Sequence, residues 1–206
     1  MSVKTKLEIK NDLSDYHARF WKVIDASFKE AKSLDALRVK LGYAPYLYSR
    51  TFANIVFDSI ARNAIIEFAQ DDRIQVRLER QTVKFLFPGG ILIRFKKGDE
   101  NHLGQNHKTQ AVLNFTQAAG LFDDLPYDTS KVEVVWHANV LNTKLEQIFV
   151  VARDGDHLLW KYEIDPAGTA EVLPFVDVPS TPQDDIVVHP IITPKRVNRP
   201  GAEADK

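Results

Sequence analysis

Hydrophobic positions near the start of the chain recur with the period of an α-helix. Over residues 16–31 the apolar side chains fall three or four residues apart along one face, which predicts an amphipathic helix. We expect this helix to begin at a cap formed by Asp12 or Ser14 and to end near Lys32. Residues 1–11 are expected to form a solvated lead-in.

Two further helical segments are predicted before the pattern changes. A short helix is expected over residues 34–41, with Gly42 as its C-terminal cap. A long helix begins at Ser49 or Thr51 and ends near Asp72. Its apolar stripe consists of Phe52, Val56, Ile60, Ala64 and Phe68.

From residue 74 the pattern alternates with the period of a strand. Residues 74–80 alternate apolar and charged side chains, and they lead into a hairpin over residues 82–99 whose turn is Pro88-Gly89-Gly90. A three-residue loop makes one face apolar by pairing Phe87 with Ile91, Phe85 with Ile93 and Val83 with Phe95. The other face then pairs Leu86 with Leu92, Lys84 with Arg94 and Thr82 with Lys96. A two-residue Gly89-Gly90 loop would mix the faces, so the pattern favours the longer loop.

A polar segment separates this hairpin from the later strands. The first half of residues 98–120 is expected to be a loop, whereas residues 109–119 fit either a short helix or an irregular strand. Strand patterns return over residues 131–140 and 145–165, where Asp154-Gly155 predicts a two-residue hairpin turn. The expected register sets Val151 against Leu158 and Phe149 against Trp160.

These elements predict an α+β fold in which N-terminal helices pack on a mainly antiparallel β-sheet. Residues 1–72 form the helical part and residues 73–172 the sheet part of the same domain. Residues 173–206 are expected to be an extended, Pro-rich tail with a disordered end, because six of the ten prolines fall there.

Composition narrows the class of protein. The chain has 206 residues and is 44% hydrophobic, which is enough for a sizeable core. It has no cysteine, so disulfides, thiolate metal sites and cysteine nucleophiles are excluded. We expect a soluble, cytoplasmic protein, because the sequence shows neither the apolar core of a signal peptide nor a stretch long enough to span a membrane.

The net charge of −1 conceals two segments of opposite sign. Residues 73–119 carry eight Lys and Arg against three Asp and Glu, whereas residues 120–185 carry four against thirteen. The first segment therefore suits an anionic partner, unless the two segments neutralise each other within the fold.

Motifs for catalysis are not found. The sequence has no phosphate-binding glycine loop, dinucleotide fingerprint, HExxH helix or serine-hydrolase elbow, and the six histidines show no ligand spacing, so no cofactor or metal is expected. A divalent-metal nuclease is the catalytic alternative, with Glu67, Asp71, Glu79 and Lys84 as candidates. In the expected register, however, Glu79 lies on the face opposite Lys84.

The polar face of the hairpin is the candidate binding site. Lys84 opposite Arg94, beside Lys96 and Arg80, costs stability unless an anion offsets the repulsion. Nucleic-acid phosphates, acids of a partner protein or internal acids from residues 120–185 could do so, with internal pairing or solvation as the default. The candidate binding residues are Arg80, Lys84, Arg94, Lys96, Lys97, Gln105, Asn106, Thr109 and Gln110.

A family resemblance covers about residues 74–165. The segments that carry it are, in order, IRFKK, NHKTQAVLNF, LFDDLP, VEVVWHANVLNTKLEQIFVV and WKYEID. They resemble a group of uncharacterised bacterial proteins encoded beside repressor-like helix-turn-helix proteins and repressor-cleaving zinc metallopeptidases, in mobile-element, toxin–antitoxin or phage-defence settings. Because the metallopeptidase motif is missing here, the resemblance implies an accompanying protein rather than the protease.

The expected function is that of a non-catalytic interaction protein of a bacterial phage-defence or toxin–antitoxin module. It would bind a partner protein or nucleic acid through the basic hairpin face, without a membrane, and a homo-oligomer is possible. One alternative is the metal-dependent nuclease or toxin. The other is a structural or assembly protein whose Pro-rich tail drives self-association.

Overall fold

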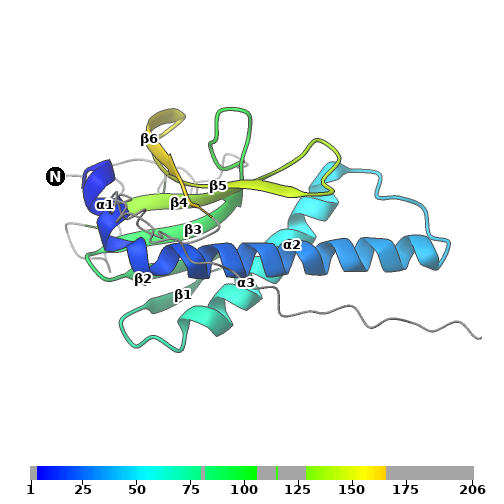
Figure 1. The fold of residues 1–206 in the computed structure, drawn as a ribbon, viewed down its shortest axis with the longest axis horizontal. Helices are drawn as coiled ribbons and strands as arrows, with labels where there is room; N and C mark the ends of the chain where they lie inside the picture. Colours follow the sequence, from blue (N-terminus) through cyan, green and yellow to red (C-terminus); the bar gives the residue numbers. More distant parts are fainter. Residues whose placement is uncertain (1–3, 80–81, 106–114, 116–128, 166–206) are drawn as a thin grey trace, which may run out of the picture. The chain divides into compact units, whose positions relative to one another are not determined.

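Three helices precede a six-stranded sheet in the part of the chain that the structure describes (Figure 1). This computed structural model describes residues 4–79, 82–105, 115 and 129–165. The helices are α1 (Lys6–Asp12), α2 (His17–Lys40) and α3 (Ser49–Phe68), with a 3₁₀ turn, η1 (Ser14–Tyr16), between the first two. The predicted tail over residues 173–206 and the ambiguous segment over residues 109–119 lie outside the described residues, apart from Phe115.

The sheet confirms the predicted fold class. Its strands are β1 (Gln75–Glu79), β2 (Thr82–Phe87), β3 (Ile91–Lys97), β4 (Ser130–Ala138), β5 (Leu145–Asp154) and β6 (His157–Glu163), and their order in space follows the sequence. Neighbouring strands are antiparallel except β3 and β4, which are parallel. A parallel pair needs a crossover connection, which residues 98–129 provide.

The β2–β3 hairpin has the predicted register. Phe85 pairs with Ile93, Leu86 with Leu92 and Phe87 with Ile91. Gly89 and Gly90 both have positive φ, at 77° and 71°, which a side chain would disfavour. The alternation of apolar and polar positions therefore set this register correctly.

Two predictions about the helices were wrong. The lead-in contains α1, which a capping box between Thr5 and Glu8 stabilises and which Ile9 anchors by being fully buried. The separate helix over residues 34–41 is the last part of α2, because no Gly or Pro interrupts the helix before Gly42. Gly42 has a φ of +78°, as expected for a residue just past a helix end.

The register of the β5–β6 hairpin also differs from the prediction. The pair next to the turn is Asp154 with His157, so the two loop residues are Gly155 and Asp156. A bulge between Ala152 and Arg153 then shifts the remaining pairs by one residue. As a result Val151 pairs with Lys161 and Phe149 with Glu163.

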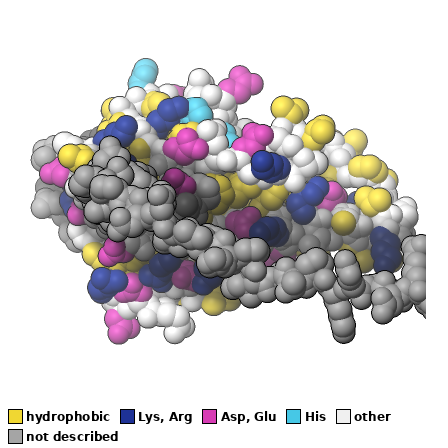
Figure 2. Space-filling view, in the orientation of Figure 1, with side chains coloured by type: hydrophobic (Ala, Val, Ile, Leu, Met, Phe, Trp, Pro, Cys, Tyr) yellow, Lys and Arg dark blue, Asp and Glu magenta, His cyan; other side chains and the backbone are white. Residues whose placement is uncertain are grey.

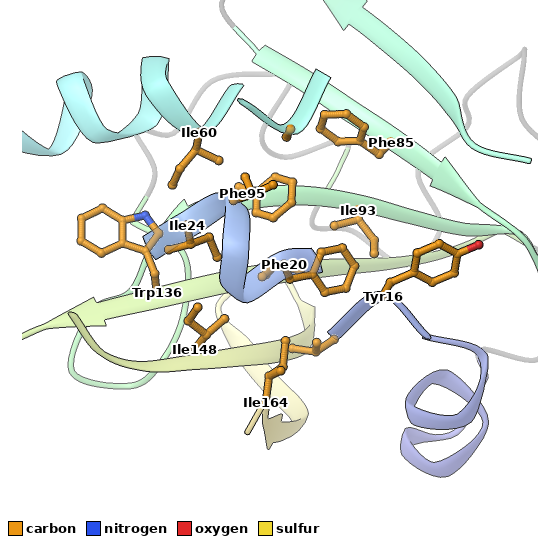
Figure 3. Packing of buried hydrophobic residues seen from close by; sticks show 14 of the residues in the cluster. Tyr16, Phe20, Ile24, Ile60, Phe85, Ile93, Phe95, Trp136, Ile148 and Ile164 are labelled. Atoms are coloured by element: carbon orange, nitrogen blue, oxygen red, sulfur yellow. The ribbon is translucent and has the colours of Figure 1, made fainter. Parts of the chain in front are cut away.

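The main core lies between α2, α3 and one face of the sheet (Figure 3). Aromatic rings dominate its centre. Phe68 of α3 lies 5.7 Å from Phe20 of α2, 5.5 Å from Phe85 and 5.3 Å from Phe87, between ring centroids. Phe20 also contacts Phe95, at 5.9 Å. Such edge-on contacts join both long helices to the central strands.

We expect the protein to lose stability in mild acid because of a buried histidine. His17 is 3% exposed, its Nε2 lies 3.1 Å from the hydroxyl of Tyr162, and burial lowers its pKa from 6.5 to about 4. Above pH 6.5 the histidine is neutral in both the folded and the unfolded state, so stability does not change there. Between pH 6.5 and pH 4 only the unfolded state takes up the proton, which costs up to about 3 kcal/mol.

Urea unfolding measured from pH 7.5 to pH 4 would test this expectation. His17→Gln serves as the comparison, because it keeps a hydrogen-bonding group but does not titrate. The variant should show a smaller fall in the free energy of unfolding than the wild type. Equal slopes for the two proteins would contradict the assignment to His17.

Candidate functional site

The predicted binding residues that the structure describes lie mostly on the second face of the sheet, the face turned away from the main core. Two small apolar clusters also cover this face: Leu86 and Leu92 with Phe115, and Leu103 with Val135, Phe149 and Val151. Lys84 and Arg94 are only 3% and 4% exposed. The basic face of the hairpin is therefore buried at its centre.

Arg94 forms an ion pair with a glutamate on the neighbouring strand. Arg94 of β3 and Glu133 of β4 are register partners, and the Nε and Nη2 groups of Arg94 both donate to Oε1 of Glu133, with Nε at 2.8 Å. The Glu133 side chain is fully buried. Burial lowers the pKa of the Arg94 guanidinium and the charge of Glu133 opposes that effect, so each ion depends on the other.

Arg153 of β5 joins this pair from the other side. Its Nη1 lies 3.6 Å from Oε2 of Glu133 and donates to the carbonyl of Gly104. Its Nε donates to the carbonyl of Gly155, and its Nη2 donates to the carboxylate of Asp156. The side chain of Arg153 is 8% exposed. One buried carboxylate therefore lies between two arginines from different strands.

Gly104 connects the loop after β3 to these ions. Its N–H donates to Oε2 of Glu133 at 3.1 Å, and its carbonyl accepts from Arg153. A Cβ at this position would lie 2.5 Å from Oε2 of Glu133 and 2.8 Å from Cβ of Lys96. Only glycine allows the backbone to approach the carboxylate this closely. We call Arg94, Glu133, Arg153 and Gly104 the ion network.

Lys84 has an acid partner on its own face, which corrects the predicted position of Glu79. Arg77 pairs with Lys84 in the register of β1 and β2, so Glu79 lies on the same face, two residues further along. The Lys84 ammonium donates to Oε1 of Glu79 at 2.6 Å. Phe115 lies over both basic groups, with its ring centroid 3.9 Å from Cζ of Arg94 and 5.6 Å from Nζ of Lys84.

Lys96 and Lys97 are neighbours in β3 but diverge to opposite sides. Lys96 begins on the second face beside Gly104, and its ammonium lies 5.7 Å from the ring of Phe57 on α3. Lys97 lies 5.7 Å from the ring of the core residue Trp136. The predicted set of cations is therefore split between two sides of the strand.

Among the described residues, no carboxylate forms an ion pair with Lys96. Burial lowers the pKa of Lys96, the positive charge of Arg94 lowers it further, and Glu133 opposes both. Lys97 differs in having an acceptor, since its ammonium donates to Oδ1 of Asn142 at 3.3 Å. Burial also lowers the pKa of Lys97. An anion placed near Lys96 would relieve the repulsion from Arg94, which Glu133 offsets only in part.

Two histidines lie together at the end of the second face. The ring centroids of His102 and His137 are 4.8 Å apart, and both rings contact Phe149. His102 adopts a φ of +61°, which is uncommon for a residue with a side chain. Burial, and next the charge of His102, lower the pKa of His137 to about 4. Within the described residues no three His, Asp or Glu side chains gather in a way that could hold a metal ion.

The carboxylates considered for a nuclease are engaged by basic side chains. Glu67 and Asp71 lie together at the end of α3, where Arg19 binds both of them at 3.0 Å and 3.2 Å. Arg73 binds Asp71 as well, and its hydrogen bonds lower the pKa of Asp71. Glu79 lies apart from them, paired with Lys84. This arrangement gives the nuclease hypothesis no support.

Sequence reasoning missed the members of the ion network other than Arg94. Glu133 stands in the run KVEVVW, where a single acid inside an apolar strand that is buried on both faces was the available signal. Gln105 is exposed, and its N–H donates to the carbonyl of Lys97. Arg80, Asn106, Thr109 and Gln110 lie outside the described residues.

No protein-family model matches the chain, and searches of curated proteins and of solved structures found no significant match. None of the helices that the structure describes has both the length and the apolar character needed to cross a membrane.

Proposed function

We propose that this chain is a non-catalytic interaction protein of a bacterial phage-defence or toxin–antitoxin module. It binds an anionic surface, either acids of a partner protein or phosphates of a nucleic acid, near the end of β3, where the Lys96 ammonium lies beside Phe57 of α3. The proposal retains the basic strand β3 as the contact but moves its centre from Lys84 and Arg94 to Lys96.

The observation that carries the proposal is the electrostatic state of Lys96. Its ammonium is partly buried, it lies close to the positive ion network, and its pKa is lowered by both effects. A phosphate or carboxylate beside it would form a charge-assisted hydrogen bond and would offset the repulsion from Arg94. Binding of an anion is therefore favoured at this lysine.

The buried ion pairs limit which basic residues can be substituted to test binding. Glu79 and Glu133 already engage Lys84 and Arg94, so reversing either charge would disrupt folding as well as binding. Variants at Lys84 or Arg94 therefore cannot test binding by themselves. Lys96 can be changed without breaking an ion pair between described residues.

We expect Lys96→Glu to weaken binding about tenfold or more, because it replaces attraction to the anion by repulsion. The matched comparison is Lys97→Glu, which makes the same charge change at the next residue but on the other side of β3. It should change binding by no more than about twofold to threefold. Circular dichroism and thermal unfolding would establish that both variants fold.

Binding is measured at several salt concentrations with two kinds of ligand. One is a set of fluorescein-labelled single-stranded and double-stranded DNA and RNA oligonucleotides. The other is the protein that co-purifies with the native chain, isolated and added back. Two results would overturn the proposal. In the first, Lys96→Glu binds a ligand of the native chain with unchanged affinity. In the second, Lys96→Glu and Lys97→Glu lose the same amount of affinity.

A further inference from the structure

The end of α2 and the connection to α3 contain no buried residue. The last buried position of α2 is Ala31, and the first of α3 is Phe52. Residues 32–51, which we call the arm, lie between them and are exposed or half-buried throughout. Figure 1 shows α2 continuing past the sheet and past the start of α3 before the chain returns.

The arm is nevertheless rich in large apolar side chains. Seven of them are exposed by 44% or more: Leu34 44%, Leu37 51%, Val39 63%, Leu41 62%, Tyr43 61%, Leu47 84% and Tyr48 56%. Figure 2 shows hydrophobic side chains at the surface on this side of the molecule. Single exposed leucines are normal in proteins, but a group of this kind marks an interaction site.

Contacts within the arm link the end of α2 to the connection that follows it. The Nη2 group of Arg38 donates to the carbonyl of Ala44 at 2.5 Å, and the guanidinium lies 4.1 Å from the ring centroid of Tyr46. The N–H of Tyr43 donates to the carbonyl of Arg38. These contacts tie residues 43–46 back to α2.

We propose that the arm pairs with the arm of a second copy of this chain to form a two-fold symmetric dimer. Leu34, Leu37 and Leu41 have the i, i+3, i+7 spacing of a helix–helix seam, and such a seam is filled best by another helix with the same spacing. In an isologous contact each copy supplies that helix to the other.

The available area agrees with a dimer. The exposed surface of Leu34, Leu37, Leu41, Tyr43, Leu47 and Tyr48 amounts to roughly 700 Å². If a second copy covers all six, this area lies within the range of about 600–1,000 Å² that each partner contributes to a standard interface. In the monomer this surface remains in contact with water. Its burial is the source of stability for the pair.

The charges of the arm determine how dimerisation depends on salt concentration. Lys32, Arg38, Lys40 and Arg50 outnumber the one acid, Asp35. An antiparallel pair brings Asp35 of one helix toward the basic C-terminal half of the other, but net repulsion between the arms remains. Added salt should therefore strengthen the dimer, whereas it would weaken the binding of an acidic partner protein.

The first test is the mass of the full-length protein in solution, measured by light scattering between about 1 and 100 μM. We expect twice the mass of the chain at the upper end, and dimerisation that strengthens between about 50 and 500 mM NaCl. Leu37→Asp should weaken dimerisation at least tenfold while circular dichroism stays unchanged. The comparison is Val140→Asp, which alters a side chain that is 98% exposed in the β4–β5 turn and should remain dimeric.

The second test uses the absence of cysteine from the chain. Leu37→Cys should form a disulfide-linked dimer rapidly under mild oxidation, because the two thiols lie close to the symmetry axis. Val140→Cys is more exposed and should link only slowly, through chance collisions. Three results would overturn the proposal: a monomer at every concentration, a dimer that Leu37→Asp does not weaken, or equal linking of the two cysteine variants. The outcome does not depend on Lys96, which lies outside the arm.

Discussion

Replacing Glu133 by alanine is expected to lower the free energy of unfolding by about 3–5 kcal/mol, a large share of the stability of an ordinary domain. The carboxylate is fully buried, accepts hydrogen bonds from Arg94 and from the N–H of Gly104, and forms an ion pair with Arg153 at 3.6 Å. Without it, two buried guanidinium groups repel each other and Gly104 loses its acceptor. Urea unfolding at pH 7.5 measures the loss.

Two comparisons make this test specific to the ion network. Glu146→Ala removes an exposed carboxylate from the adjacent strand β5 and should change stability by less than about 0.5 kcal/mol. The double variant Arg94→Met with Glu133→Leu replaces the ion pair by apolar side chains, while Arg153 keeps its bonds to Gly155 and Asp156. It should be more stable than Glu133→Ala alone. A loss of less than about 1 kcal/mol in Glu133→Ala would show that the network contributes little.

Phe68→Ala is the second substitution expected to have a large effect, about 3–5 kcal/mol. Phe68 is fully buried and its ring contacts Phe20, Phe85, Phe87 and Phe95, so it joins α3 to α2 and to both strands of the β2–β3 hairpin. Removing the ring leaves a cavity that these rigid aromatic neighbours fill poorly. Thermal and urea unfolding measure the change.

Ile66→Ala provides the control for Phe68. Ile66 lies two residues earlier on the same helix but is 62% exposed. The control removes apolar atoms from α3 with little change in helix propensity, so it should cost less than about 1 kcal/mol. Similar losses in both variants would mean that the effect comes from the helix and not from the aromatic core.

The sequence predicted a helix or strand correctly where its hydrophobic residues followed a single period. The stripe of apolar residues in α3 and the alternation in β2 and β3 each have a single solution that buries one face, so the helix and the hairpin register were predicted correctly. The β5–β6 register was not, because apolar residues occupy both faces of β5. A bulge at Ala152 and Arg153 then costs little in burial and leaves no mark in the pattern.

The candidate site was predicted in part. The sequence showed that Lys84 and Arg94 share a polar face and that acids in residues 120–185 could offset them. It could not show that Glu133 is the acid beside Arg94, because the parallel pairing of β3 with β4 joins residues 39 positions apart. The separation of Lys96 from Lys97 follows from strand alternation, but the partners of each lysine depend on α3 and on the β4–β5 turn.

By itself the sequence determined the fold class, the helix α3, the β2–β3 hairpin and the absence of cysteine chemistry, since each follows from local periodicity or composition. Tertiary structure alone decided which charges are buried and which apolar side chains are left exposed. Both depend on contacts between distant segments: Glu133 meets Arg94 only in the folded sheet, and the leucines of the arm are exposed only because α3 begins short of the end of α2. The periodicity of α2 indicates where its apolar side chains lie, but not what covers them.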